Sequence, residues 1–157
     1  MRILVFFCFS LLSFYAVAES TLPKGCQPVT VQGEAVTLKA KAKSLVYIHN
    51  LTSVDLWITH PVTNPGASAG WTTRLQGEKW SALALKKGPF ILNCIESRPG
   101  HEQQVPCEGT IAVCTWKGKG VKIPANKQNS TFWVAEDMSL AALNAAVGAR
   151  GFVIPNK

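Results

Sequence analysis

Short stretches in which hydrophobic and polar residues alternate run through most of the chain. LVYIHN (45–50) and VDLWITHP (54–61) show this period of two, which is typical of β-strands with one buried face. Only residues 51–53 separate them, so the pattern predicts a β-hairpin. In the second strand the apolar side chains share one face and Trp57 lies on the other, where it is either exposed or packed against a second layer.

Further strands are predicted at 80–85, 90–95, 110–116 and 131–135. We expect the strand at 90–95 to pair with the strand at 110–116. FVIP (152–155) is a short stretch that would close the sheet.

The period changes near the end of the chain, where DMSLAALNAAVGARG (137–151) predicts a helix. Asp137 is the expected N-cap and Gly148 the expected left-handed stop. Leu140, Leu143 and Val147 form one apolar stripe. Strands at short, regular spacing with one late helix predict a mainly β fold, a sandwich or barrel-like single domain with one C-terminal helix.

Residues 1–18 have the pattern of a secretory signal peptide. Arg2 gives a positive start, an apolar run follows, and Ala-Val-Ala at 16–18 before Glu19 is a small-x-small cleavage site. The run is too short to predict a membrane span, and no later stretch is apolar enough for one. We therefore expect a periplasmic or secreted protein whose mature chain, residues 19–157, is one domain without a transmembrane segment.

The charge balance narrows the choice of partners only slightly. The net charge is +7 for the full chain and +6 once Arg2 is removed with the signal peptide. A modest positive charge favours anionic surfaces such as lipid or glycan, and solubility explains it as simply. The lysines are spread along the chain, as at Lys39, Lys43 and Lys86, and the absence of a dense basic run argues against nucleic acid.

Four cysteines remain after the signal peptide is removed: Cys26, Cys94, Cys107 and Cys114. An even number in an exported domain indicates two disulfides, and four cysteines allow three connectivities. We favour Cys94–Cys107, because the loop is short and contains the Pro99-Gly100 turn, which leaves Cys26–Cys114. These bonds would brace the domain and anchor its N-terminus.

ESRPGHEQQVPC (96–107) is the main candidate for chemistry. It collects Glu96, Arg98, His101 and Glu102 in a segment that we predict to be a polar loop tethered at its base. A zinc-protease helix is excluded, because Val105 stands where that motif needs a second histidine and prolines interrupt the segment. The sequence indicates no metal site and no cofactor.

Two interpretations of this loop stay open. Its carboxylates and His101 are suited to acid–base chemistry, and Arg98 is suited to holding an anion. The simpler interpretation is a hairpin loop that exposes polar side chains to water. A tethered loop favours binding over catalysis, since no serine or cysteine nucleophile stands in a recognisable frame.

Aromatic and histidine residues give weaker signals. Trp57 and Trp71, the latter in the Gly/Ser-rich loop 62–71, are the tryptophans most suited to an exposed, glycan-binding role, whereas most tryptophans are expected in the core. We expect His60 to be a half-buried hydrogen-bonding residue. His49 and Asn50 are expected to cap the turn that follows them.

Several stretches together resemble the enhanced-entry protein B (EnhB) family, small exported proteins of Gram-negative intracellular bacteria. They are IHNLTSVDLWITHP, ASAGW, KWSALAL, ESRPGHEQQVPC, FWVAEDMSLAAL and RGFVIP. The resemblance covers the chain from about Cys26 to Pro155. It implies an accessory protein acting in host infection and supplies no catalytic residues.

The sequence therefore predicts an exported, non-enzymatic binding protein that acts in host-cell entry or envelope maintenance through the 96–107 loop. Its partner would be an envelope or host-surface protein or a glycan, with Glu96, Arg98, His101, Glu102, Trp57 and Trp71 as candidate binding residues. One alternative is a cell-wall-active or other hydrolytic enzyme that uses Glu96, His101 and Glu102. Another is a structural envelope protein without a ligand site.

Overall fold

Two antiparallel sheets and one helix make up the computed structural model, which describes residues 22–61, 72–116, 122, 124 and 130–154. The predicted signal peptide, the loop 62–71 with Trp71 and Pro155 lie outside the described residues. The fold is mainly β, as the sequence predicted, with a sandwich-like arrangement of the sheets and one C-terminal helix.

The first sheet, sheet A, has five strands in the order β1-β9-β3-β6-β10. They are β1 (Gln27–Val29), β9 (Ile111–Trp116), β3 (Ser44–Asn50), β6 (Trp80–Leu85) and β10 (Phe132–Met138). Almost every residue of β3, β6 and β9 is buried, because both faces of these strands are covered.

The second sheet, sheet B, has the order β2-β7-β4-β5, and a further strand, β8, pairs with β7. The strands are β2 (Ala35–Ala40), β7 (Gly88–Arg98), β4 (Leu56–Thr59), β5 (Thr72–Leu75) and β8 (His101–Val105). Burial alternates along β2, β4 and β5, which is the signature of a sheet with one face in the core and the other in water.

The predicted strands exist, but two of the predicted pairings are wrong. The strands at 45–50 and 54–61 do not form a hairpin, since β3 belongs to sheet A and β4 to sheet B. The strand at 90–95 does not pair with 110–116, because β7 bonds to β2, β4 and β8 while β9 bonds to β1 and β3. In both cases the connection crosses from one sheet to the other, as sandwich topologies require.

Asn50 makes the crossing between β3 and β4 possible. Its side chain is fully buried, and its amide nitrogen donates to the carbonyl oxygens of Val54, Leu75 and Gln76 at 2.7, 3.0 and 3.1 Å. Its side-chain oxygen accepts from the backbone N–H of Thr52 at 2.9 Å. Asn50 therefore caps the turn as predicted, and it also ties the turn to the end of β5.

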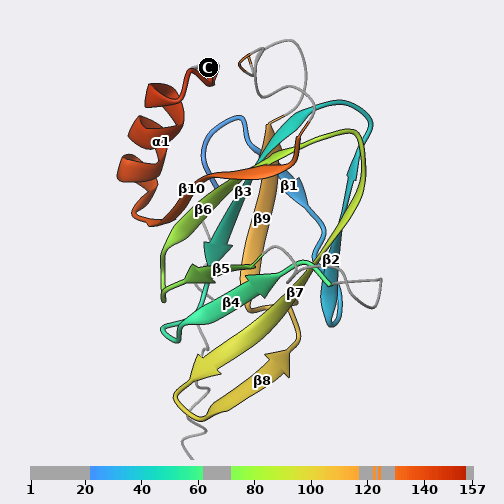
Figure 1. The fold of residues 1–157 in the computed structure, drawn as a ribbon, viewed down its shortest axis with the longest axis vertical. Helices are drawn as coiled ribbons and strands as arrows, with labels where there is room; N and C mark the ends of the chain where they lie inside the picture. Colours follow the sequence, from blue (N-terminus) through green and yellow to red (C-terminus); the bar gives the residue numbers. More distant parts are fainter. Residues whose placement is uncertain (1–21, 62–71, 117–121, 123, 125–129, 155–157) are drawn as a thin grey trace, which may run out of the picture.

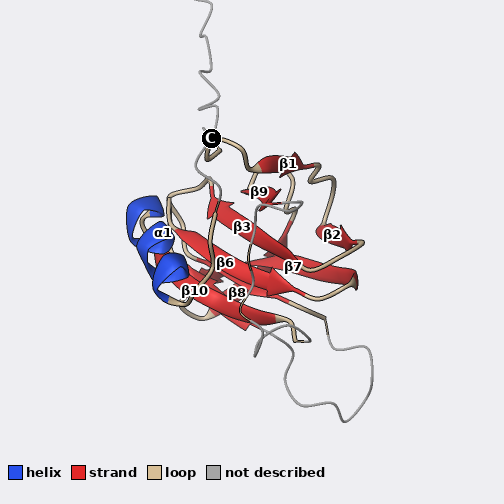
Figure 2. Cartoon of the chain, turned by 90° about the horizontal axis from the view of Figure 1, so that it is seen from above, coloured by secondary structure: helices blue, strands red, loops and turns tan. Residues whose placement is uncertain are grey.

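Two apolar layers hold the sheets and the helix together. The larger lies between the sheets and includes Ile48, Leu56, Leu83 and Leu92. The second lies between sheet A and the helix α1 (Leu140–Ala149), whose Leu143 and Val147 are fully buried. Figure 1 and Figure 2 show α1 beside β10 and β6, on the side of the molecule away from β2.

The N-terminal end of the helix differs from the prediction. Ser139, not Asp137, is the N-cap, and its hydroxyl oxygen accepts from the backbone N–H of Ala142 at 3.4 Å. Asp137 has a positive φ of 56°, and its carboxylate accepts from the backbone N–H and side-chain amide of Gln76 at 2.7 and 2.8 Å. Asp137 thus links β10, at one edge of sheet A, to the end of β5, at one edge of sheet B.

The C-terminal end of the helix also differs. The left-handed glycine is Gly151, with a φ of 83°, rather than Gly148. Arg150 is the C-cap, and its backbone N–H bonds to carbonyl oxygens of the last turn. The apolar stripe is confirmed for Leu143 and Val147, whereas Leu140 is only partly buried.

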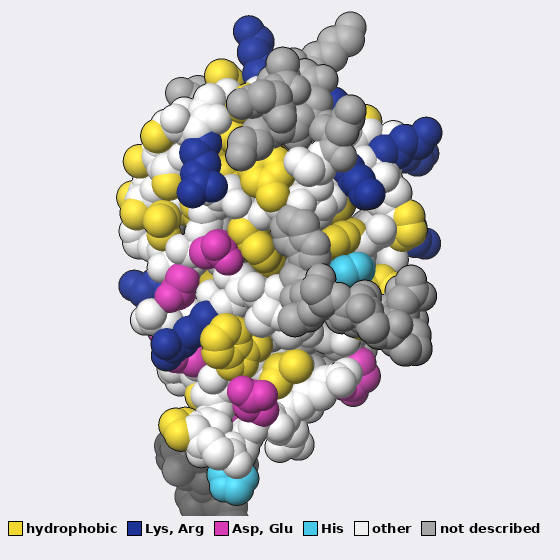
Figure 3. All heavy atoms as spheres, in the orientation of Figure 1, with side chains coloured by type: hydrophobic (Ala, Val, Ile, Leu, Met, Phe, Trp, Pro, Cys, Tyr) yellow, Lys and Arg dark blue, Asp and Glu magenta, His cyan; other side chains and the backbone are white. Residues whose placement is uncertain are grey.

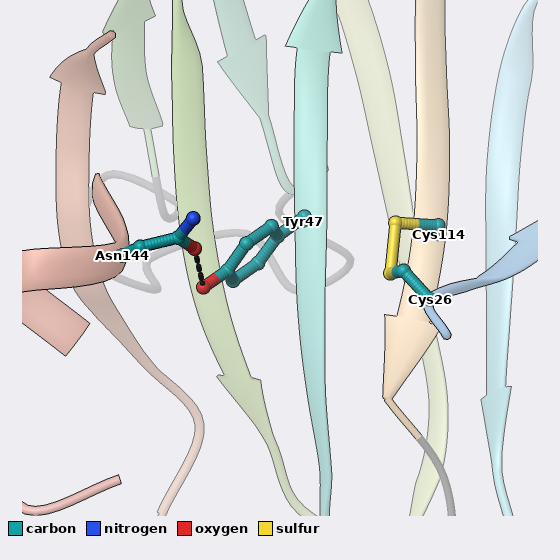
Figure 4. Close-up of a disulfide and its surroundings, with 4 residues drawn as sticks. All are labelled: Cys26, Tyr47, Cys114 and Asn144. Carbon is teal, nitrogen blue, oxygen red and sulfur yellow. Dashed lines mark hydrogen bonds between the residues drawn. A yellow bond between two sulfur atoms is a disulfide. The ribbon is translucent and has the colours of Figure 1, made fainter. Parts of the chain in front are cut away.

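The layer between sheet A and the helix contains the first disulfide. Cys26 and Cys114 are bonded, which confirms the predicted pairing, and their Cα atoms are 5.6 Å apart. In Figure 4 the disulfide and Tyr47 are seen together, and the Tyr47 hydroxyl donates to the side-chain oxygen of Asn144 in α1 at 2.9 Å. Burial raises the pKa of Tyr47, so the phenol stays protonated and serves as a hydrogen-bond donor.

Candidate functional site

The segment 96–107 forms most of a β-hairpin at the edge of sheet B rather than the predicted loop. β7 continues to Arg98, the chain turns at Pro99 and Gly100, and β8 returns in antiparallel register. Gly100 has a φ of 78°, a conformation that glycine adopts without steric cost. The hairpin lies at the end of the molecule opposite to α1 (Figure 1).

A disulfide closes the base of this hairpin. Cys94 and Cys107 are bonded, with Cα atoms 5.3 Å apart, and both are fully buried against the core between the sheets. The pairing is the predicted one. It anchors the returning chain directly after β8, where Pro106 lacks the N–H that would continue the ladder.

Strand geometry divides the predicted site residues between the two faces of the hairpin. Arg98 is paired with His101, and Ser97 with Glu102, so His101 and Glu102 project from opposite faces. The Glu96 carboxylate accepts a hydrogen bond from the Arg98 guanidinium on the same face as His101. The structure therefore brings together Glu96, Arg98 and His101 and separates them from Glu102.

The side chains at the hairpin tip are largely in water. The Arg98 side chain is 66% exposed, whereas that of Glu96 is 18% exposed because it lies nearer the sheet. His101 and Glu102 are exposed. This end of the molecule thus presents polar groups at fixed positions without burying them.

The outer face of sheet B continues the Glu102 face of the hairpin. Trp57 on β4 lies between Arg74 on β5 and Ile95 on β7, and Ile95 is paired with Gln104 on β8. These four residues form one row across the sheet. Trp57 lies opposite the buried Leu56 and Ile58, as predicted, and it is partly buried.

Polar groups surround Trp57. Its indole nitrogen is buried and has no hydrogen-bond partner among the residues that the structure describes. Arg74 forms an ion pair with Asp55, which raises the pKa of the Arg74 guanidinium through the hydrogen bond and the charge of the carboxylate. Figure 3 shows hydrophobic side chains at the surface over β4 and β7, with basic and acidic side chains beside them.

The other two histidines lie away from the hairpin tip. His60, just after β4, is partly buried, its Nδ1 is 2.6 Å from the carbonyl oxygen of Ile91, and its ring stacks on Phe90. This confirms the predicted hydrogen-bonding role. His49, which was also expected at the turn, stacks on Trp80 in sheet A at a centroid distance of 4.0 Å. Burial lowers the pKa of His49, and the neighbouring Glu78 partly offsets this effect.

Three tryptophans pack in or against the core. Trp80 and Trp116 are buried between sheet A and the helix, and Trp133 packs against the layer between the sheets. Trp71 lies outside the described residues, so Trp57 is the candidate aromatic residue whose position is known.

A cavity that the sequence did not predict lies at the edge of the sandwich where β1 and β2 lie side by side. Its volume is about 830 Å³, and lysines of the β2–β3 connection line it. The alternating KAKAK at 39–43 is the sequence feature that marks it, although spacing alone does not distinguish these lysines from the others spread along the chain.

The described residues contain no group of three His, Cys, Asp or Glu side chains arranged to hold a metal ion. Nor does this part of the chain contain a helix with the length and hydropathy needed to cross a membrane. Comparisons with protein-family models, curated proteins and solved structures found no match for this chain.

Proposed function

We propose that this is an exported binding protein that uses the β7–β8 hairpin and the adjoining outer face of sheet B to recognise a protein or glycan of the envelope or host surface. The observation that carries the proposal is the hairpin itself. Two paired strands and a buried disulfide fix its backbone, while Arg98, His101 and Glu102 stay in water. Side chains held in place without being needed for packing are what a recognition surface requires.

The placement of the histidines supports binding over hydrolysis. The hydrolytic alternative needs Glu96, His101 and Glu102 on one face, within hydrogen-bond reach of one another. Here Glu96 shares a face with His101 but is bonded to Arg98, whereas Glu102 projects from the opposite face. His60 bonds to β7 well away from the tip, and His49 stacks in sheet A.

The resemblance to the enhanced-entry B family supports the biological setting, host-cell entry or envelope maintenance. The two disulfides are compatible with an oxidising compartment such as the periplasm or the exterior. Export has its own test, because the intact mass of protein recovered from the native bacterium should correspond to a chain that begins at Glu19. Retention of residues 1–18 would contradict it.

The binding test uses one variant for each face of the hairpin. One double variant, Arg98→Ala with His101→Ala, removes side chains from one face, and a second, Glu102→Ala with Gln104→Ala, removes them from the other. The matched control is Lys24→Ala with Glu136→Ala, because both residues are exposed and lie elsewhere. Each immobilised protein is incubated with envelope fractions, host-cell membranes and a glycan array.

We expect one face variant to lose at least tenfold in affinity for a single bound component, with an unchanged melting temperature, while the control binds normally. The same variant should fail to restore entry in a strain lacking the gene. If both face variants bind and restore entry like the unmodified protein, the hairpin is not the recognition surface. Loss of binding accompanied by unfolding would assign the residues a structural role instead.

A further inference from the structure

The two sheets leave one edge of the sandwich open. β1 is an edge strand of sheet A and β2 is an edge strand of sheet B, and the two lie side by side in Figure 1 and Figure 2. Between them lies the cavity of about 830 Å³. This volume is within the range of roughly 300–1,000 Å³ that is usual for small-molecule sites.

The inner wall of the cavity has an apolar part beside polar side chains that include Thr37, Ser44 and Thr115. The apolar part is formed by Leu38 of β2, Val46 of β3 and Leu85 of β6, which belong to the core layer between the sheets, and by the partly buried Val29 of β1. Leu38, Val46 and Leu85 are each at most 3% exposed. A ligand that enters the cavity therefore meets the side of the hydrophobic core.

The rim of the cavity is basic. Lys39, Lys41 and Lys43 line it from the end of β2 and the connection to β3, and all three are exposed at the surface. Lys86 and Lys87 lie at the same end of the sandwich, because β2 ends beside Gly88 and β3 begins beside Leu85.

Acidic side chains are sparse at the lysine end of the cavity in the described structure, and Glu34 lies at its other end, between the lining residues Gln32 and Ala35. None of the residues lining the cavity in the described structure is Asp or Glu, and the segments 35–48 and 80–95 contain neither. In Figure 3 the acidic side chains gather in the lower half of the molecule, whereas most Lys and Arg side chains lie in the upper half. The rim therefore carries three lysine charges at the end of β2 away from Glu34, where they can attract an anionic group.

We propose that this cavity binds a single-chain anionic lipid as a monomer, with the acyl chain against Val29, Leu38, Val46 and Leu85 and the carboxylate or phosphate head group on Lys39, Lys41 and Lys43. The apolar wall selects for the chain, since each buried methylene strengthens binding by about fourfold. The lysines select for the charge of the head group, and their long stems add apolar contact around its neck. This site is independent of the hairpin and lies near the other end of the molecule.

The experiment titrates the folded, disulfide-bonded protein with octanoate, decanoate and dodecanoate below their micelle concentrations, by calorimetry. Dodecyl phosphate tests the second anionic head group, and dodecyltrimethylammonium tests a cation on the same chain. Backbone amide shifts of Val29, Leu38 and Val46 report whether the ligand lies in the cavity.

We expect binding of one molecule per chain, with affinity rising about fourfold for each added methylene until the cavity is filled. Dodecyltrimethylammonium should not bind. The triple variant Lys39→Gln, Lys41→Gln and Lys43→Gln should weaken dodecanoate binding at least tenfold. The control, Lys79→Gln with Lys122→Gln, lies away from the cavity lining and should bind dodecanoate normally.

Ala42→Trp is the second variant. Ala42 lines the cavity from an exposed position, so a large side chain there blocks the mouth without altering the buried core, and binding should be lost. The proposal would be overturned by equal affinity for octanoate and dodecanoate, by equal binding of the cationic detergent, or by amide shifts outside the cavity. Binding to anionic vesicles without binding to monomers would overturn it in favour of surface electrostatics. Variants of the hairpin should bind dodecanoate normally, which keeps this test separate from the proposed recognition surface.

Discussion

Sheet A and sheet B have similar strands but very different surroundings. Sheet A lies between sheet B and the helix, so β3, β6 and β9 are buried on both faces. Sheet B packs on one side only, and in the described part of the chain no helix or strand covers its outer face. The difference suggests different roles for the two sheets. Sheet A contributes to the core on both faces, whereas Trp57 and the hairpin lie at the surface of sheet B.

The Cys26–Cys114 disulfide should contribute the most to stability, because it braces sheet A across 88 residues of chain. Replacing both cysteines by Ser should lower the free energy of unfolding by about 4–5 kcal/mol, because a long closed loop restricts the unfolded chain strongly. The Cys94–Cys107 disulfide spans only 13 residues, and its loss should cost about 3 kcal/mol. Urea unfolding of both double variants measures the two values; a larger loss for Cys94–Cys107 would reverse the assignment of roles.

Truncation of one apolar side chain over each sheet tests the comparison directly. Leu143→Ala removes a fully buried contact of the helix with sheet A and should cost about 3 kcal/mol. Ile91→Ala acts on the outer face of sheet B, where the side chain is 37% exposed, and should cost about 0.5 kcal/mol. Similar losses in thermal unfolding would mean that the outer face of sheet B is packed after all.

Alanine at the hairpin tip should have little effect on stability. Arg98→Ala, His101→Ala and Glu102→Ala should each change the free energy of unfolding by less than about 0.5 kcal/mol, since water already satisfies these side chains. Unfolding of any of the three would indicate a structural network at the tip. Denaturant titration, made alongside the binding measurements, is sufficient to decide.

The smallest effect is expected from His49, whose ring is packed against Trp80 in sheet A. Because burial lowers its pKa in the folded protein, the unfolded chain binds more protons as the pH falls below about 6.5. The contribution of His49 is therefore present above that pH and is lost as the pH falls through the lowered value. His49→Phe keeps the stacking and should reduce the loss of stability between pH 7.5 and pH 5.5; an unchanged pH profile would show that His49 does not titrate there.

The sequence was informative where burial alone decides the structure. Alternation placed Leu56 and Ile58 in the core and Trp57 on the opposite face, and it predicted most of the strands. The disulfide pairing followed from the short spacing of Cys94 and Cys107. These features depend on local pattern, which a single chain displays directly.

Strand partners and the site depended on contacts that the pattern does not encode. A period of two shows that a strand has two different faces, but it does not show which strand is its hydrogen-bonded partner. The sequence therefore predicted one hairpin from β3 and β4, although they lie in different sheets. Asp137 and Ser139 are both residue types that cap helices, and only the contact with Gln76 shows that Asp137 serves elsewhere. Strand pairing continues past Cys94, so most of the segment expected to be a loop forms two paired strands. Because His101 and Glu102 are neighbours in one of these strands, they project from opposite faces.

The hydrogen bonds between Asp137 and Gln76 connect the two sheets at one edge of the sandwich. They fasten the β10–β5 side, and the β1–β2 side opposite has the cavity instead. The two sheets are therefore held together on the β10–β5 side, and local opening of the sandwich should begin on the β1–β2 side. In hydrogen exchange the amides of β2 should therefore exchange faster than those of β10. A ligand could then enter the cavity while the β10–β5 edge and the hairpin stay in place.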